Sequence, residues 1–168
     1  LSITDSYKKR GGNVLWVGHP MIDLTKKLPL KKDARTILSL RPDENILLLM
    51  PASRPQELKY ILPTFMMAAR KLQQKYPSLV VYIPSCRKVF DEKFNEAFRK
   101  YQVKGKVISQ KDNARLKPYI YSLTKIAFCK SGTVNMELAL YGIPQILSLI
   151  HISEPTRPLY ISYAVFCL

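Results

Sequence analysis

Apolar stretches of strand length alternate along this chain with segments of helical periodicity, and the connections between them are short. Three such stretches are Asn45–Met50, Leu79–Ile83 and Ile126–Cys129. Strands that are apolar at every position are typical of a parallel sheet that is covered on both faces. We therefore expect an α/β fold, with a Rossmann-like open parallel sheet and helices on both of its faces.

The longest helical pattern begins at Pro55. Proline is tolerated at this position because the first turn of a helix does not need its N–H. Its apolar stripe includes Phe65 and Met66, which we interpret as core residues rather than a cofactor pocket. Pro63 lies inside this pattern, where a proline can kink a helix. Leu1–Gly12 is expected to be linker-like. Further strands are expected at Asn13–Val17, at Lys106–Ser109 and from Ile143. Further helices are expected at Asp33–Leu40, Val89–Tyr101 and Val134–Tyr141, and a helix or turn at Ala114–Leu123.

The length of the chain is that of one domain. For this length the chain is strongly basic. Its 168 residues include 27 Lys and Arg against 12 Asp and Glu, which gives a net charge of +15. Such an excess suits an anionic partner, which could be a nucleic acid, a phosphorylated substrate or an anionic membrane. A solvated basic surface is the alternative, since no dense block of basic residues forms an arm.

The sequence favours neither a metal site nor a disulfide framework. Cys86, Cys129 and Cys167 form no CxxC pair, and His19 has no Cys or His partner near it. A reducing compartment is therefore the default expectation. No apolar stretch reaches the ~18–20 residues of a membrane span. We expect no metal and no cofactor.

The end of the chain reads as translated adapter DNA rather than as evolved protein. From Leu147 the sequence is LSLIHISEPTR, which is the in-frame translation of a transposase mosaic-end sequencing adapter. ISYAVFCL, the translation of an outer flow-cell adapter, follows after three residues. We therefore expect residues 147–168 to be a non-native tail, and the true continuation after Ile146 to be missing.

Pro51–Arg54, which reads PASR, follows the apolar stretch Asn45–Met50 and precedes the long helical pattern. The always-charged Arg54 can bind a phosphate through two parallel hydrogen bonds. Ser53 can donate a hydroxyl or cap the helix. The alternative is a capped helix beside a solvated arginine.

Ser131–Thr133 is a second turn between an apolar stretch and a helical pattern, and it comes shortly after the stretch Ile126–Cys129. Gly132 lets a ligand approach the backbone, and the N-terminus of the following helix favours an anion. Glu137 lies one helical turn after Thr133, where its carboxylate could accept hydrogen bonds from a ribose diol. The alternative is an ordinary helix start. Gly18 and His19, which follow an expected strand, are a weaker candidate for lining a site.

Three motifs in this order and spacing resemble the lipid-A-disaccharide synthase family. They are WVGHPMID at Trp16–Asp23, LLLMPASRPQEL at Leu47–Leu58 and CKSGTVNMELALYGIPQ at Cys129–Gln145. The resemblance implies a two-domain GT-B glycosyltransferase fold. It also implies a hexosyltransferase that joins UDP-2,3-diacylglucosamine to 2,3-diacylglucosamine 1-phosphate and releases UDP. Ala52 stands where the family usually has glycine.

The resemblance assigns a role to each candidate residue. Arg54 would stabilise the charge on the departing UDP, and Ser53 would contact the diphosphate beside it. Ser131, Gly132 and Thr133 would lie at the nucleotide phosphates and Glu137 at the ribose. Gly18 and His19 would lie near the cleft between the domains.

On this resemblance, residues 1–20 are the end of the N-domain and the crossing between domains, and residues 21–146 are an incomplete UDP-sugar-binding Rossmann-like domain. The N-domain with its presumed general base would be missing, so we expect the chain alone to be inactive. The implied partners are the two acylated sugars and an anionic membrane, at the cytoplasmic face of the inner membrane. A homodimer is left open for the longer protein.

The sequence leaves two alternatives open. One is another GT-B enzyme, such as a UDP-N-acetylglucosamine transferase of peptidoglycan synthesis or a UDP-sugar epimerase. The other is a basic nucleic-acid-binding module, which predicts aromatic side chains interleaved with Lys and Arg on one face. Phe65, Phe90, Phe94 and Phe98 fall on apolar helix stripes instead, so we expect no nucleic-acid partner.

Overall fold

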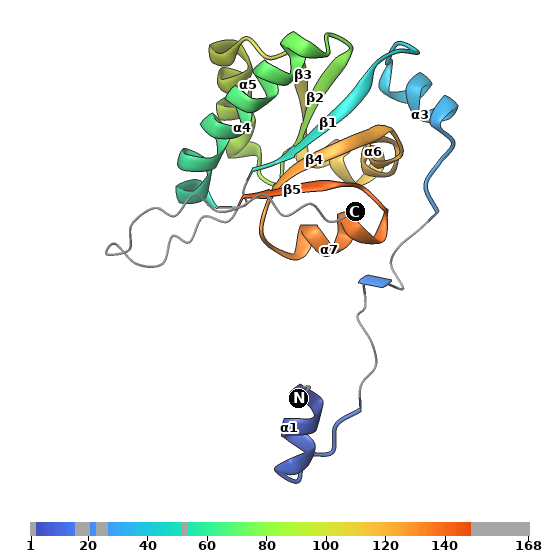
Figure 1. Cartoon of the computed structure of the whole chain (residues 1–168), viewed down its shortest axis with the longest axis vertical. Helices are drawn as coiled ribbons and strands as arrows, with labels where there is room; N and C mark the ends of the chain where they lie inside the picture. The colour runs from blue at the N-terminus through green and yellow to red at the C-terminus, as the bar shows by residue number, and fades with distance from the viewer. Residues whose placement is uncertain (1–2, 16–20, 23–26, 52–53, 149–168) are drawn as a thin grey trace.

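The computed structural model describes residues 3–15, 21–22, 27–51 and 54–148. Its centre is a five-stranded sheet in the order β3-β2-β1-β4-β5, and every neighbouring pair of strands is parallel (Figure 1). This confirms the expected α/β Rossmann-like fold. The strands are β1 (Asn45–Met50), β2 (Leu79–Pro84), β3 (Gly105–Ile108), β4 (Thr124–Lys130) and β5 (Gln145–Ser148).

Helices cover both faces of the sheet, as the apolar strands predicted. Leu47 and Leu49 point into a core shared with α4 and α5, whereas Ile46 and Leu48 point into a second core shared with α3, α6 and α7. This alternation explains why β1 is apolar at successive positions. The helices are α1 (Ile3–Lys9), α3 (Lys31–Leu38), α4 (Pro55–Lys75), α5 (Lys88–Tyr101), α6 (Gln110–Leu123) and α7 (Thr133–Leu140).

The aromatic side chains of the amphipathic helices lie in the core. Phe65 and Met66 of α4 are buried, and the Phe65 ring packs edge-on against Phe128 of β4 at 5.7 Å between centroids. Phe90 and Phe94 of α5 are buried as well. The interpretation of these residues as core is therefore confirmed, and they are not available to stack on the bases of a nucleic acid.

The path of the chain creates a crevice between β1 and β4. From β1 the chain passes to β2 and then β3 on one side, and α6 then returns it to β4 on the other side of β1 (Figure 1). In open α/β sheets, ligands bind outside the carboxyl ends of the strands where the strand order reverses in this way. Pro51–Arg54 and Ser131–Thr133 follow these two strands directly.

Two expectations about the N-terminal part were wrong. Ile3–Lys9 forms a helix rather than a linker, with Asp5 in its first turn and Lys8 and Lys9 in its last, where these charges stabilise a helix. Asn13–Leu15, the described part of the expected strand Asn13–Val17, is not a strand. A strand requires a hydrogen-bonded neighbour, and these residues pair with no described strand.

The other expected elements are present with small shifts at their ends. Helix α6 begins earlier than expected, because the Ser109 side chain caps it by accepting a hydrogen bond from the Asp112 amide. Helix α4 continues through Pro63. Strand β5 includes Leu147 and Ser148, the first residues of the expected adapter-derived tail, and the rest of that tail lies outside the described residues. None of the helices in the described part of the chain is long and apolar enough to cross a membrane.

Candidate functional site

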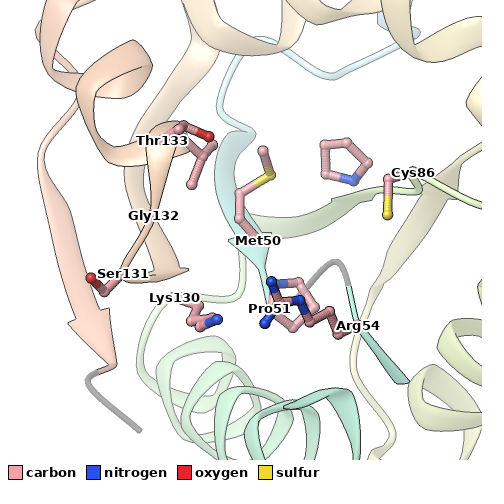
Figure 2. Close-up of a pocket in the computed structure, with 10 residues that line it drawn as sticks. Met50, Pro51, Arg54, Cys86, Lys130, Ser131, Gly132 and Thr133 are labelled. Atoms are coloured by element: carbon pink, nitrogen blue, oxygen red, sulfur yellow. The ribbon is translucent and has the colours of Figure 1, made fainter. Parts of the chain in front are cut away.

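A cavity of ≈ 270 Å³ opens at the carboxyl ends of β1, β2 and β4, at the point where the strand order reverses. Both turns singled out in the sequence contribute to it, as Figure 2 shows. Pairing of Met50 with Cys129 in the parallel register of β1 and β4 brings the two turns to the same level. The lining residues are Met50, Pro51, Arg54, Pro84, Cys86, Lys130, Ser131, Gly132, Thr133 and Val134.

Arg54 occupies the N-cap position of α4, with extended backbone angles, and its side chain is 79% exposed. Among the described residues its side chain makes a loose ion pair, 3.9 Å from Nη1 to Oε1 of Glu57. An exposed ion pair of this length contributes little to stability. The guanidinium is therefore available to an anion in the cavity.

The turn at Ser131–Thr133 is held by its neighbours. The Ser131 amide donates to the Ser148 carbonyl of β5 at 3.4 Å, and the Gly132 amide donates to Oδ1 of Asn135 at 2.5 Å. The amides of Thr133 and Val134 begin α7, and the first amides of a helix have no acceptor within it. An anion in the cavity would meet these amides and the positive end of the helix dipole.

Gly132 is not required by the backbone or by packing. Its φ of 164° is extended backbone, which any residue adopts, and a Cβ built on it would meet no atom within 4 Å. A glycine that the fold does not need, at the edge of a cavity, is suited to close approach by a ligand.

A buried polar network beneath this turn was not anticipated from the sequence. Nδ2 of Asn135 donates to Oε1 of Gln145 and to Sγ of Cys129, both at 3.1 Å, and Nε2 of Gln145 donates to the Asn135 carbonyl at 2.8 Å. Burial raises the pKa of the Cys129 thiol to about 11, so the thiol stays protonated and donates to Gln145. Asn135 thus ties the turn to β5, although the sequence alone gave it no role.

Comparison with known proteins identifies the family. A family model described as lipid-A-disaccharide synthetase matches residues 4–150. This chain belongs to that family. The lipid-A-disaccharide synthase of Prochlorococcus marinus is 45% identical over 141 residues, which are 84% of this chain and 36% of that protein. The one from Gloeothece citriformis is 35% identical over 84% of this chain and 35% of its own length.

The chain thus spans about a third of the length of the synthases that it matches. Among solved structures, a putative UDP-N-acetylglucosamine 2-epimerase from Listeria monocytogenes is similar, with a TM-score of 0.49 and 16% identity. The similarity covers 73% of this chain and 31% of that one.

Of the residues that the family resemblance singled out, Arg54, Ser131, Gly132 and Thr133 line the cavity together. Glu137 does not line it. It lies further along α7 with its side chain 20% exposed, and its Oε1 is paired with Nζ of Lys117 from α6. Burial, and then the charge of Glu137, raise the pKa of the neighbouring Tyr121.

Gly18, His19 and Ser53 lie outside the described residues, so the structure does not place them. Within the described ranges, no group of three or more His, Cys, Asp and Glu side chains could hold a metal ion. Lys130 and Cys86 line the cavity although the sequence analysis did not select them. Lys130 is the last residue of β4 and Cys86 follows shortly after β2, and these positions at the carboxyl ends of strands are the signal that could have identified them.

Proposed function

We propose that this chain forms the nucleotide-binding part of a hexosyltransferase of lipid A biosynthesis. The full enzyme would join UDP-2,3-diacylglucosamine to 2,3-diacylglucosamine 1-phosphate and release lipid A disaccharide 1-phosphate and UDP. One observation carries the proposal: in a chain of this family, Arg54 and the turn that begins α7 line a single cavity at the point where the strand order reverses.

The cavity is suited to the diphosphate of a UDP-sugar. Arg54 would pair with the phosphate oxygens and stabilise the negative charge that grows on UDP as the bond between the anomeric carbon and the diphosphate breaks and the acceptor hydroxyl bonds to that carbon. The same phosphates would lie at Ser131, Gly132 and Thr133. They would accept hydrogen bonds from the hydroxyl groups there and from the amides at the start of α7. Ser53, next to Arg54 in the sequence, would contribute a further hydroxyl.

Glu137 would bind the ribose. Its Oε1 is paired with Lys117, but a carboxylate has two oxygens and several acceptor positions. The ion pair therefore fixes the carboxylate and leaves an oxygen for the ribose hydroxyls. Gly18 and His19 would lie near the cleft toward the acceptor domain.

The reaction proposed here needs no metal ion or cofactor, because protein cations and helix amides take the phosphate charge. The net charge of +15 suits work on phosphorylated lipids at an anionic surface. We propose that the enzyme acts in the cytoplasm, bound peripherally to the inner membrane, and a homodimer is a further possibility for the longer protein. This chain alone is expected to bind the donor nucleotide without turnover.

A binding titration with UDP tests the proposal. Arg54→Ala is expected to raise the Kd for UDP about 10–100-fold, because a hydrogen bond to a charged group contributes about 1.5–3 kcal/mol. Arg99→Ala, which removes an exposed arginine in the last turn of α5, is the matched control and should leave the Kd unchanged. A wild-type chain that binds a single-stranded oligonucleotide but not UDP would contradict the proposal, and an unchanged Kd for Arg54→Ala would remove Arg54 from the site.

A further inference from the structure

A buried carboxylate lies between the two turns of the cavity. Glu57 is in the first turn of α4, with its side chain only 9% exposed. Its Oε1 is paired with Nζ of Lys130, from the end of β4, and lies 3.9 Å from Nη1 of Arg54. The carboxylate therefore contacts a cation from each side of the crevice between β1 and β4.

This arrangement is not the best one for stability alone. A buried ion pair gains little over apolar side chains of similar size, because both charges lose their hydration. Moreover, Oε2 of Glu57 is buried and has no hydrogen-bond partner in the described part of the chain. An acidic side chain at a helix start is stabilised by the helix dipole, but this does not require contact with Lys130. A role in positioning the cations explains the arrangement better.

The ion pair keeps Lys130 beside the cavity. Lysine side chains usually keep their charged end in water, yet the side chain of Lys130, the last residue of β4, is only 28% exposed and lines the cavity. Figure 2 shows it directed toward Arg54. An ammonium has three N–H donors, so the bond to Glu57 leaves two of them for a ligand.

Glu57 also makes it possible for two cations to share one site before any ligand is bound. Arg54 and Lys130 would repel each other without an anion nearby, and the carboxylate that both contact reduces this repulsion. Together the three groups carry a net positive charge. A diphosphate would complete the neutralisation.

We propose that Lys130 is a second diphosphate-binding cation of this cavity, and that Glu57 is the positioning residue that holds it there. This inference rests on the proposed nucleotide-binding function and adds two residues to it. Arg54 supplies a planar pair of donors on one side, and Lys130 supplies a point charge from the other strand.

The test compares UDP with uridine, which lacks the phosphates, by NMR titration of the chain and its variants. Lys130→Met should raise the Kd for UDP about 10–100-fold and leave the Kd for uridine unchanged. Lys130→Arg, which keeps the charge, should recover most of the affinity. Lys125→Met, an exposed lysine near the other end of β4, is the matched control and should bind UDP as the wild type does.

Glu57→Gln tests the positioning role. It should weaken UDP binding in the wild-type chain, but have little effect when residue 130 is already methionine, because Glu57 acts through Lys130. The double variant also removes the buried Glu57 charge, so it should fold even if Lys130→Met alone leaves Glu57 too costly to bury. Uridine binding confirms in each variant that the nucleoside site is intact.

The outcomes separate this inference from the proposed function. If the wild-type chain does not bind UDP, the proposed function is wrong and the inference with it. If the wild type binds UDP and Lys130→Met binds it equally well, only the role of Lys130 is wrong. Equal losses from Glu57→Gln in both backgrounds would show that Glu57 does not act through Lys130.

Discussion

Replacing Gly132 by alanine is expected to change the free energy of unfolding little and to weaken the binding of UDP. The substitution adds one methyl group at the edge of the cavity, where no protein atom lies within 4 Å of the new Cβ. The φ of 164° is accessible to alanine. The remaining cost to the fold is the poorer propensity of alanine at an N-cap, which is under about 1 kcal/mol, and the hydrogen bond from the residue 132 amide to Asn135 is retained.

The cost to an anion in the cavity is larger. A methyl group at this position holds a phosphate away from the amides that begin α7, so that at least one charged hydrogen bond is lost. Such a bond contributes about 1.5–3 kcal/mol, so Gly132→Ala should raise the Kd for UDP about 10–100-fold. Isothermal titration calorimetry measures this change, and urea denaturation measures the change in the free energy of unfolding.

Gly105→Ala is the control with the opposite expectation. At the start of β3, a Cβ would lie 2.2 Å from the Val81 carbonyl oxygen and 2.5 Å from Cε1 of Phe98. Overpacking of this kind typically costs about 1–3 kcal/mol or more, whereas the cavity is at the other end of the strands. The reasoning would be refuted if Gly132→Ala destabilised the fold as much as Gly105→Ala, or if it bound UDP as tightly as the wild type.

Two further substitutions test the polar contacts. Asn135→Ala should destabilise the fold by about 1–3 kcal/mol, because Gln145 stays buried after losing a donor, while Asn95→Ala, an exposed change on α5, should have almost no effect in the same urea denaturation. The pKa of Glu44 is lowered, chiefly by the hydrogen bond from Lys104. Its contribution to stability is therefore present above the ordinary carboxyl pKa of 4.5 and is lost as the pH falls through the lowered folded value. The stability difference between wild type and Glu44→Gln should be large at neutral pH and disappear in strong acid, and a pH-independent difference would contradict this.

The sheet was predictable because its central strands are buried on both faces. β1 was expected at the residues where it lies, since Ile46 to Leu49 are fully buried and a continuous apolar run can hardly be accommodated elsewhere. The start of β3 was less well predicted. Gly105 belongs to the strand only because it pairs with Val81, and nothing in the local sequence specifies that pairing.

In the N-terminal part, the local sequence pattern was not sufficient to predict the secondary structure. Asn13–Leu15 has the composition of a strand, but strand formation depends on a partner, and no described strand pairs with it. The polar composition of Leu1–Gly12 and its two final glycines predict a linker, and the helix Ile3–Lys9 within it, with 7 residues, is too short to display an apolar stripe. Its terminal charges were the available signal, and they are weak on their own.

At the site, the sequence predicted which turns meet but not the contacts that hold them. Parallel strands end at one edge of a sheet, so two turns that each follow a buried strand were expected to lie close together. Lys130 and Glu57 are 73 positions apart, and their contact depends on the register between β1 and β4. A periodicity argument contains no information about register between strands that are distant in the sequence.

The amide donors and the cations of the cavity are held by different kinds of contact. The register of β1 and β4 sets where the two strands end, and the hydrogen bond between the Gly132 amide and Asn135 holds the start of α7. Among the described residues, Lys130 is held by its ion pair with Glu57, whereas Arg54 is only loosely paired with the same carboxylate. Loss of Glu57 should therefore affect the binding of the diphosphate without moving the amides, whereas loss of Asn135 should affect both. In the proposed anion site, the amide donors thus depend on backbone and Asn135 contacts, and Lys130 depends on its ion pair with Glu57.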